Sequence, residues 1–300
     1  MTVRRSLRLL AALMLVAALT SCTAVRYSGI SRFQQYEVAS PDVPASCDGY
    51  RIAFATDFHL PSKYRERQLH STVRAINHLD PDLLLLGGDY QEDCDHVEPL
   101  FAALAECAPR DGVWGVMGNN DYERCTDDIR ESMSYHGMHC LEGEVVEPHD
   151  SFFVVGVSWN AHPDGPHAQQ EVALLNQRLD AMARRRGYRA GDEPFVLFLT
   201  HTPDHAELAD VRSVDVALAG HTHGGQVTLF RLWAPVTASR YGKRFLLGRN
   251  PNSRGVPVIT SGGLGTSSYP IRFCAPTDIV LLTLRRTARA ADGTLPTFRF

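Results

Sequence analysis

Two histidines two residues apart, His221 and His223, lie between glycines in residues 220–226. The largely apolar run at residues 214–219 precedes them, which predicts a buried strand that the glycines end. Side chains at positions i and i+2 of an extended segment leave on the same face, so both imidazoles can converge on one point. Neutral imidazole is the commonest nitrogen ligand of transition metals. The spacing therefore predicts a metal site at the end of this strand.

Other polar side chains follow apolar runs at residues 51–56, 83–86, 113–117 and 195–199, each of which predicts a strand. In chain order they are Asp57, His59, Asp89, Asn119 and His201. Sites in open α/β sheets lie at the carboxyl ends of strands, so we expect these side chains to meet the two histidines at one edge. Mixed imidazole, carboxylate and amide-oxygen ligation suits Mn²⁺, Fe, Zn²⁺ or Co²⁺ better than Mg²⁺ or Ca²⁺.

Five short motifs in this order resemble those of the calcineurin-like metallophosphoesterases. They are Asp57-Phe58-His59, Gly88-Asp89, Gly118-Asn119-Asn120-Asp121, His201 and Gly220-His221-Thr222-His223. Each motif alone is weak evidence, whereas five in order, each after a predicted strand, are specific. The resemblance covers roughly residues 50–285. Residues 201–204 and 269–273 resemble the bacterial membrane-associated phosphodiesterase branch of the family.

The resemblance implies an α/β fold in which two mixed sheets form a four-layer α/β/β/α sandwich. It also implies a metal-dependent phosphoric ester hydrolase with two divalent ions, of which Mn, Fe or Zn are the expected elements. By the same resemblance Asp89 bridges the two ions and a water activated between them attacks phosphorus in line. The implied ligands of the first ion, besides Asp89, are Asp57, His59 and His223. Those of the second are Asn119, His201 and His221.

One position departs from the family pattern. The residue after Asn119 is a histidine in the family, where it steadies a phosphoryl oxygen or protonates the leaving group, and here it is Asn120. An amide can donate a hydrogen bond but cannot deliver a proton at neutral pH. Either the substrate has a good leaving group, such as a phosphate in a pyrophosphate bond, or another residue supplies the proton. His162 is the first candidate for that donor, and His205 is less favoured.

Asp121 keeps the acidic position of the family motif, where it can orient a neighbour. The candidate catalytic residues are Asp89, Asn119, Asn120, Asp121 and His162.

The N-terminus has the pattern of an export signal. Arg4, Arg5 and Arg8 precede an apolar run at residues 9–19, which is too short to span a bilayer and typical of a signal peptide. Residues 19–22 resemble the bacterial lipobox, in which the cysteine, here Cys22, is acylated. We therefore expect an exported lipoprotein held at the extracytoplasmic face of a membrane. An ordinary cleaved signal or an uncleaved N-terminal anchor is the alternative.

The expected domain organisation follows from this interpretation. Residues 1–21 are the signal peptide, 22–49 a tether, 50–286 one metallophosphoesterase domain and 287–300 a tail. Within the domain, helices are predicted at residues 64–79, 97–108 and 171–186. The final strands, at 227–230, 256–260 and 279–284, are expected to be antiparallel and to complete the second sheet.

Cysteine content agrees with export. Beyond Cys22 the chain has Cys47, Cys94, Cys107, Cys125, Cys140 and Cys274. An even number of cysteines outside the cytosol favours disulfides. Nearness in sequence favours the pairs Cys94–Cys107 and Cys125–Cys140, and free buried thiols are the alternative.

Composition limits the partners. The formal net charge is −4 and no basic block is present, which argues against a nucleic-acid partner. An anchored site lies near a membrane, so a lipid-linked or cell-envelope phosphodiester or pyrophosphate is the expected substrate. The alternatives are a phosphomonoesterase or protein phosphatase, a nuclease, and a non-catalytic metal-binding envelope protein.

Overall fold

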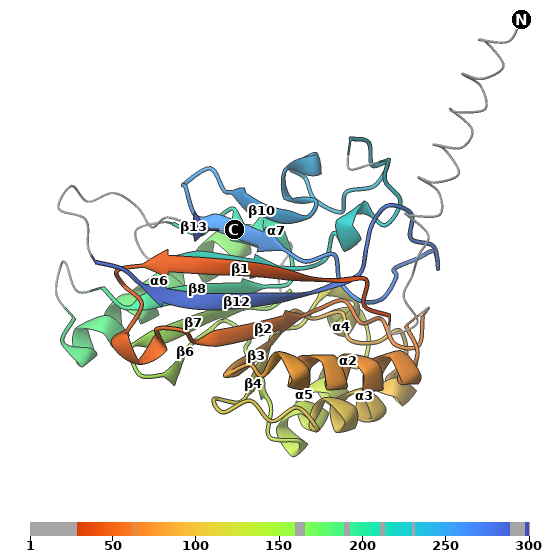
Figure 1. Cartoon of the computed structure of the whole chain (residues 1–300), viewed down its shortest axis with the longest axis horizontal. Coiled ribbons are helices and arrows are strands. Elements are labelled where there is room, and N and C mark those ends of the chain that lie inside the picture. Colours follow the sequence, from red (N-terminus) through yellow and green to blue (C-terminus); the bar gives the residue numbers. More distant parts are fainter. Residues whose placement is uncertain are drawn as a thin grey trace, which may run out of the picture.

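The structure is a computed structural model that describes residues 29–62, 64–159, 166–188, 193–210, 214–229, 232–288 and 298–299. Two mixed sheets face each other, and helices cover their outer faces (Figure 1). The core between the sheets contains Phe54 and Leu85 from one sheet and Leu199 and Leu218 from the other. The expected four-layer α/β/β/α sandwich is therefore confirmed.

The first sheet has seven strands in the order β13-β1-β12-β2-β3-β4-β5. In that order they are Phe298–Arg299, Arg32–Ser40, Asp278–Arg286, Arg51–Ala55, Leu83–Leu86, Val113–Gly115 and His139–Cys140. Strands β2 to β5 run parallel, and β12 pairs antiparallel with β2. In β3, Leu83 and Leu85 face the other sheet, while Leu84 and Leu86 face the helices. Burial on both faces explains why this strand is a continuous apolar run.

Three main helices cover this sheet. They are α2 (Glu66–Leu79), α3 (Val97–Leu104) and α5 (Thr126–Tyr135). The short elements η2 (Cys94–His96) and α4 (Asn119–Glu123) lie on this side, whereas η1 (Ala45–Cys47) contacts β12 and buries Cys47 between the sheets. In α2, Leu69, Val73 and Ile76 recur at helical spacing and are buried against the sheet.

The second sheet has six strands in the order β10-β11-β9-β8-β7-β6. In that order they are Gly248–Pro251, Pro257–Thr260, Val216–Ala219, Phe195–Thr200, Phe152–Val157 and Glu144–His149. The helical elements on this half are α6 (Pro166–Arg186), α7 (Pro203–Ala206), η3 (His223–Gly225) and η4 (Gly242–Phe245). Leu175 and Leu179 of α6 pack on Phe153 and Val155 of β7.

The structure corrects the expected tether. Strand β1 lies within the segment expected to link the domain to a membrane, and it pairs in parallel with β12 from Arg32↔Asp278 to Ser40↔Arg286. Val38 is fully buried between the sheets. The weak hydrophobic pattern of β1 concealed it, because only part of the strand is buried.

The last strands also differ from the expectation. Strand β12 belongs to the first sheet, and β11 runs parallel to β9. Instead of the expected strand at residues 227–230, the described part of this segment has two isolated bridges, Val227↔Phe273 and Leu229↔Trp233. Periodicity identifies an extended segment but carries no information about which sheet receives it.

The expected disulfide pairs are wrong. Cys94 bonds to Cys125 with a Cα–Cα distance of 5.5 Å, and Cys107 and Cys140 are free. The bond joins the segment before α3 to the residue before α5, and these two helices pack on each other. Helix packing, rather than nearness in sequence, therefore decides the pairing.

The expected signal peptide and Cys22 lie outside the described residues. Within the part of the chain that the structure describes, no helix has the length and apolar character needed to cross a bilayer.

Candidate metal centre

The predicted ligands follow β2, β3, β4, β8 and β9, whose carboxyl ends meet at one edge of the sandwich. Five of the seven adopt a positive φ, namely Asp57 (54°), His59 (45°), Asp89 (51°), His221 (67°) and His223 (51°). Left-handed backbone at residues other than glycine is strained and collects at functional sites. The chain therefore bends sharply at these five ligands, and their side chains are directed to one place.

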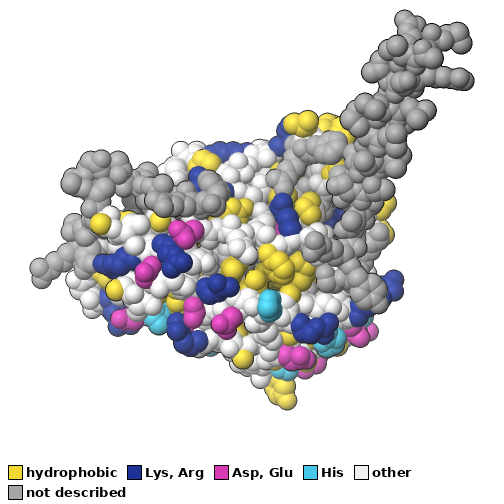
Figure 2. Space-filling view, viewed as in Figure 1, with side chains coloured by type: hydrophobic (Ala, Val, Ile, Leu, Met, Phe, Trp, Pro, Cys, Tyr) yellow, Lys and Arg dark blue, Asp and Glu magenta, His cyan; other side chains and the backbone are white. Residues whose placement is uncertain are grey.

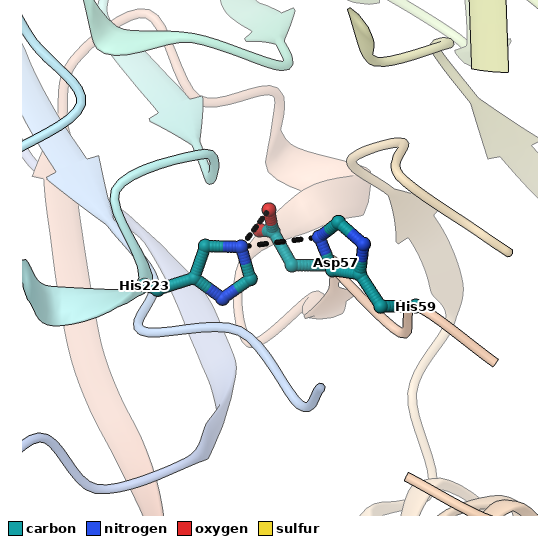
Figure 3. A group of neighbouring side chains, drawn as sticks. All are labelled: Asp57, His59 and His223. Atoms are coloured by element: carbon teal, nitrogen blue, oxygen red, sulfur yellow. Dashed lines mark hydrogen bonds and ion pairs between the residues drawn. The ribbon is translucent and has the colours of Figure 1, made fainter. Parts of the chain in front are cut away.

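Asp57, His59 and His223 form the first group (Figure 3). His59 Nε2 lies 3.1 Å from His223 Nε2, and His223 Nε2 lies 3.4 Å from Asp57 Oδ1. Asp57 and His59 are fully buried and His223 is nearly so. Thr56 donates its hydroxyl to Asp57 Oδ2 at 2.8 Å, which fixes the carboxylate.

Asp89, His201 and His221 form the second group. His201 Nε2 lies 3.0 Å from His221 Nδ1 and 3.2 Å from the amide oxygen of Asn119. The structure thus adds Asn119 to this group, as the sequence predicts.

Asp89 touches both groups. Its Oδ2 atom lies 3.3 Å from His59 Nε2 and 3.5 Å from His201 Nε2. The other carboxylate oxygen accepts the backbone N–H of Asn120 at 3.0 Å. One carboxylate oxygen is therefore placed between the two ligand groups, where a bridging ligand must be.

The spacing of the ligand atoms suits metal ions. A zinc–nitrogen bond is about 2.1 Å long, so neighbouring ligand atoms on one ion lie roughly 3.0–3.4 Å apart. The contacts within the two groups range from 3.0 Å between His201 and His221 to 3.5 Å between His201 and Asp89. Imidazole nitrogens and carboxylates packed this closely in a buried place fit two divalent cations.

Hydrogen bonds from the far side of two rings set their tautomers. His59 donates from Nδ1 to Glu92 at 2.6 Å, and His201 donates from Nδ1 to the Gly87 carbonyl at 2.7 Å. With the proton on Nδ1, each neutral ring presents a lone pair at Nε2 to the centre. Such partners orient metal-binding histidines and raise their basicity.

Among the protein groups alone, burial opposes charge on Asp89, but His201 and His59 outweigh it and hold its pKa well below the usual range. Burial likewise opposes charge on the two histidines. Contacts with Asp89 and Glu92 nevertheless raise the pKa of His59 to about 10, and Asp89 raises that of His201 to about 9. Asp89 is therefore ionised at the middle of the centre, and its negative charge also favours a bound cation.

The pKa values of the other two ligand histidines, His221 and His223, shift downward. Burial, followed by the neighbouring His201, lowers the pKa of His221 to about 3, and burial and His59 lower that of His223. Burial raises the pKa of Asp57. Neutral imidazoles are the form that coordinates a metal.

Asp121 does not face the ligand groups. Its buried carboxylate accepts backbone N–H bonds from Asp89 (2.7 Å), Gly118 (2.7 Å) and Tyr90 (3.0 Å). Burial, with Asp89 nearby, raises the pKa of Asp121 to about 7. Asp121 thus holds two ligand loops together, which matches an orienting role.

Asn120 lies beside the first ligand group. Its side-chain amide nitrogen is 3.1 Å from His59 Nδ1 and donates to Glu92 at 3.3 Å. The Asn120 side chain therefore contacts both His59 and Glu92, the carboxylate that orients His59.

Of the two expected proton donors, His162 lies outside the described residues. His205 is fully buried, with Nδ1 3.3 Å from the Thr200 hydroxyl and its ring centroid 6.0 Å from that of Trp159. It is absent from both ligand groups found among the described residues.

Arg272 lies in the segment 269–273 that resembles the bacterial phosphodiesterase branch. The structure shows its guanidinium donating to the backbone carbonyls of Gly265 (2.8 Å from Nε) and His223 (3.1 Å), and Nη2 lies 3.1 Å from His223 Nδ1. Arg272 therefore braces the loop that carries His223.

Two residues near the centre were not foreseen. Glu92 supports His59, and the ring of Trp159 lies 5.2 Å from that of His221 and 6.2 Å from that of His201. Glu92 follows Asp89 by three residues and Trp159 follows β7, but neither position has a distinctive spacing. Both are recognisable only once the loops are placed.

Comparisons with known proteins agree with this centre. The family model of the calcineurin-like phosphoesterases matches residues 50–225. The chain is 26% identical over 260 residues to an uncharacterized metallophosphoesterase of Aquifex aeolicus, covering 85% of this chain and 92% of the relative. It is 28% identical over 249 residues to the phosphodiesterase YaeI of Escherichia coli, covering 78% and 82%.

Among solved structures, a dimetal phosphatase from Danio rerio aligns with a TM-score of 0.47 and 14% identity, over 72% of this chain and 88% of that chain. The family match spans the strands and loops that carry every predicted ligand. The chain belongs to the calcineurin-like phosphoesterase family, and its structure holds two groups of metal-ligating side chains.

Proposed function

We propose that the protein is a phosphodiesterase or pyrophosphatase that hydrolyses a lipid-linked or cell-envelope phosphoester. The observation that carries the proposal is the position of Asp89, whose Oδ2 contacts both ligand groups. When bound, two divalent ions supply the charge that activates a water molecule and neutralises phosphoryl oxygens. We expect Mn, Fe or Zn, because four of the seven predicted ligands are imidazoles.

The protein groups fix the geometry for this reaction. Asp121 accepts the backbone N–H of Asp89, and the Asn120 backbone N–H donates to the Asp89 carboxylate. Glu92 and the Gly87 carbonyl orient His59 and His201, so that their Nε2 atoms point at the centre. The nucleophile therefore has a fixed starting position, which lowers the entropic part of the barrier.

The presence of Asn120, in place of the histidine of the family motif, favours a substrate with a good leaving group. Its amide nitrogen can donate a hydrogen bond to an oxygen but cannot protonate a departing alkoxide. A phosphate that leaves from a pyrophosphate bond needs no such proton at neutral pH. His162 remains the proposed donor for substrates with poorer leaving groups.

The cellular location is part of the proposal. The signal-like residues 1–21 and the lipobox at Cys22 support an exported protein that is held at a membrane by an acylated cysteine. An uncleaved N-terminal anchor would give the same placement. Either arrangement favours substrates of the envelope over nucleic acids.

Hydrolysis assays test the proposed reaction. The metal-free protein, reconstituted with Mn²⁺ or Zn²⁺, is given a chromogenic phosphodiester, its monoester and a nucleotide-sugar pyrophosphate. We expect metal-dependent cleavage of the diester or the pyrophosphate, with loss of that activity in Asp89→Asn. Asp93→Asn is the matched control, because Asp93 is an exposed carboxylate paired with His96 outside the centre.

Cleavage of the monoester alone would replace the proposal with a phosphomonoesterase. Two bound metals without hydrolysis of any of the three esters would indicate a binding protein. Failure to bind metal would contradict the proposed role of the centre.

A further inference from the structure

The Cys94–Cys125 disulfide lies beside the residues that support the first ligand group. Cys94 follows Glu92 by two residues, and Cys125 directly follows Arg124. Glu92 accepts the Nδ1 proton of His59 at 2.6 Å and so orients that ligand. The bond therefore joins the loop that carries Glu92 to the segment between α4 and α5.

Arg124 makes the contact between these two segments. Its Nη1 atom donates to the Glu92 carbonyl at 2.7 Å and lies 3.7 Å from Oε2 of the Glu92 carboxylate. The buried Gln91 side chain donates to the Arg124 carbonyl at 3.3 Å. The Arg124 side chain is 53% exposed, so its ion pair alone is weak. The covalent bond at the next residue is what keeps Arg124 at Glu92.

The backbone of Cys125 is strained. Its φ of 60° and ψ of 25° lie in the left-handed region, which residues other than glycine seldom adopt. Cys125 is also the N-cap of α5, a position that normally has extended backbone. We expect Cys125 to relax toward that conformation once the disulfide opens. Because α5 is held by its packing on α3, the relaxation displaces Arg124 rather than the helix.

The disulfide is accessible to a reductant. Cys94 is exposed and Cys125 is half-buried. A cavity of about 580 Å³ is lined by Cys94 and by the carboxylates of Asp95, Asp128 and Glu131. In Figure 2, magenta side chains lie along the lower right edge, where Figure 1 places α3 and α5. Negative charge around the bond repels anionic thiols and favours a neutral dithiol.

The three free cysteines in the described part of the chain do not compete for these partners. Burial raises the pKa of Cys47 to about 11 and the pKa values of Cys107 and Cys140 to about 12. Their thiols are therefore protonated near neutral pH and are poor nucleophiles. The opened pair can re-form without exchange with them.

We propose that Arg124 is a positioning residue for Glu92, and that the Cys94–Cys125 bond controls the first metal site through this contact. A dithiol gives two electrons and two protons to the bond, so that both cysteines become thiols and the dithiol becomes a cyclic disulfide. Arg124 then leaves Glu92, and the Glu92 carboxylate no longer fixes the ring of His59. The first ion is therefore bound less tightly in the reduced protein.

The second ligand group does not depend on this contact. The Gly87 carbonyl orients His201 by accepting its Nδ1 proton at 2.7 Å, and Gly87 lies outside both joined segments. We therefore expect redox dependence at the first site only. Metal binding is the quantity that changes, so the outcome does not depend on which ester the protein hydrolyses.

Isothermal titration of the full-length protein with Mn²⁺ tests the proposal. The metal-free protein is titrated before and after reduction with dithiothreitol, which is removed without oxygen, and its thiols are counted. We expect the affinity of one site to fall about tenfold, the other to stay unchanged, and reoxidation to restore the first. His221→Ala, which lacks a ligand of the second group, should keep the redox-dependent site, and His223→Ala should lose it.

Two variants separate this route from general loosening of the fold. In Glu92→Gln, reduction should cause no further loss of affinity, because the support of His59 is already impaired. Cys94→Ser with Cys125→Ser should have the weak first site and no response to dithiothreitol, which excludes an effect elsewhere in the chain. Melting temperatures will show that each variant is folded.

Substitutions of Arg124 test its positioning role in the oxidised protein. Arg124→Gln should weaken the first site, and Arg124→Lys should recover part of the affinity. Arg130→Gln is the matched control, because Arg130 pairs with Glu142 and Asp127 on the surface of α5. It should change neither affinity.

Unchanged affinities on reduction, equal losses at both sites, or a further loss in reduced Glu92→Gln would each overturn the proposal. A Cys94–Cys125 bond that dithiothreitol leaves closed would overturn it as well.

Discussion

Glu92→Gln is expected to weaken one metal site and spare the other. The Glu92 carboxylate accepts the Nδ1 proton of His59 at 2.6 Å, which leaves the Nε2 lone pair facing the first ligand group. A glutamine can present its NH₂ group to the same nitrogen, which favours the opposite tautomer and removes that lone pair. His201 is held by the Gly87 carbonyl and does not depend on Glu92.

The size of the effect follows from the position of Glu92. Loss of such a supporting group lowers metal affinity about 10- to 100-fold, which is about 1.4–2.7 kcal/mol. The Glu92 side chain is 31% exposed, so solvent screens part of its charge. Glutamine can also still accept the hydrogen bond in one orientation. We therefore expect a loss near the lower limit, about tenfold.

Competition with a chelator, followed by isothermal titration, measures the two affinities separately. Glu98→Gln is the matched control, because Glu98 also accepts a hydrogen bond from a histidine, His136 at 2.9 Å, but on the surface. It should leave both affinities unchanged. Equal weakening of both sites in Glu92→Gln, or no change in either, would refute the reasoning.

Three further predictions concern stability. Burial raises the pKa of Asp215 to about 7, so the folded state binds its proton more tightly than the unfolded state, and the free energy of unfolding should fall as pH rises from about 4 to 7; denaturant titrations should show a weaker pH dependence in Asp215→Asn. The Cys94–Cys125 bond closes 31 residues, so Cys125→Ser should cost about 3–4 kcal/mol, and an unchanged midpoint would contradict this bond. Gly88 has φ 88° with the backbone of Gly118 beside it, so Gly88→Ala should lower the melting temperature and cost at least about 1–3 kcal/mol; Gly137→Ala, also at positive φ but in open space, should cost less.

The parallel strands could be predicted because each is an apolar run that ends at a polar motif. Strands β2, β3, β8 and β9 lie within two residues of their expected positions. Strand β1 could not be found in this way, since its partner β12 is 246 positions further along the chain at Arg32↔Asp278. The destination of β12 was mistaken for the same reason, because long-range pairing depends on how the whole sheet is assembled.

The ligands were predictable for a chemical reason. Only a few side-chain types can bind a metal, here His, Asp and Asn, and the strand ends fix their order along the chain. Supporting residues are less constrained, because a backbone carbonyl such as that of Gly87 does the same work as Glu92. Arg272 likewise could not be given a role from the sequence, because the carbonyls that it contacts are brought together only by the folded loops.

The place of β12 between β1 and β2 has a consequence for biosynthesis. The sheet core cannot close until the ribosome has released residues 278–286, because both flanking strands of the N-terminal half need this partner. A nascent chain therefore has two unsatisfied strand edges throughout most of its synthesis, and local contacts alone cannot complete the domain. His223 is also synthesised well after Asp57 and His59, so the first ligand group is incomplete until then. Closure of the first sheet and assembly of the metal centre therefore both depend on segments that are synthesised long after β1 and β2.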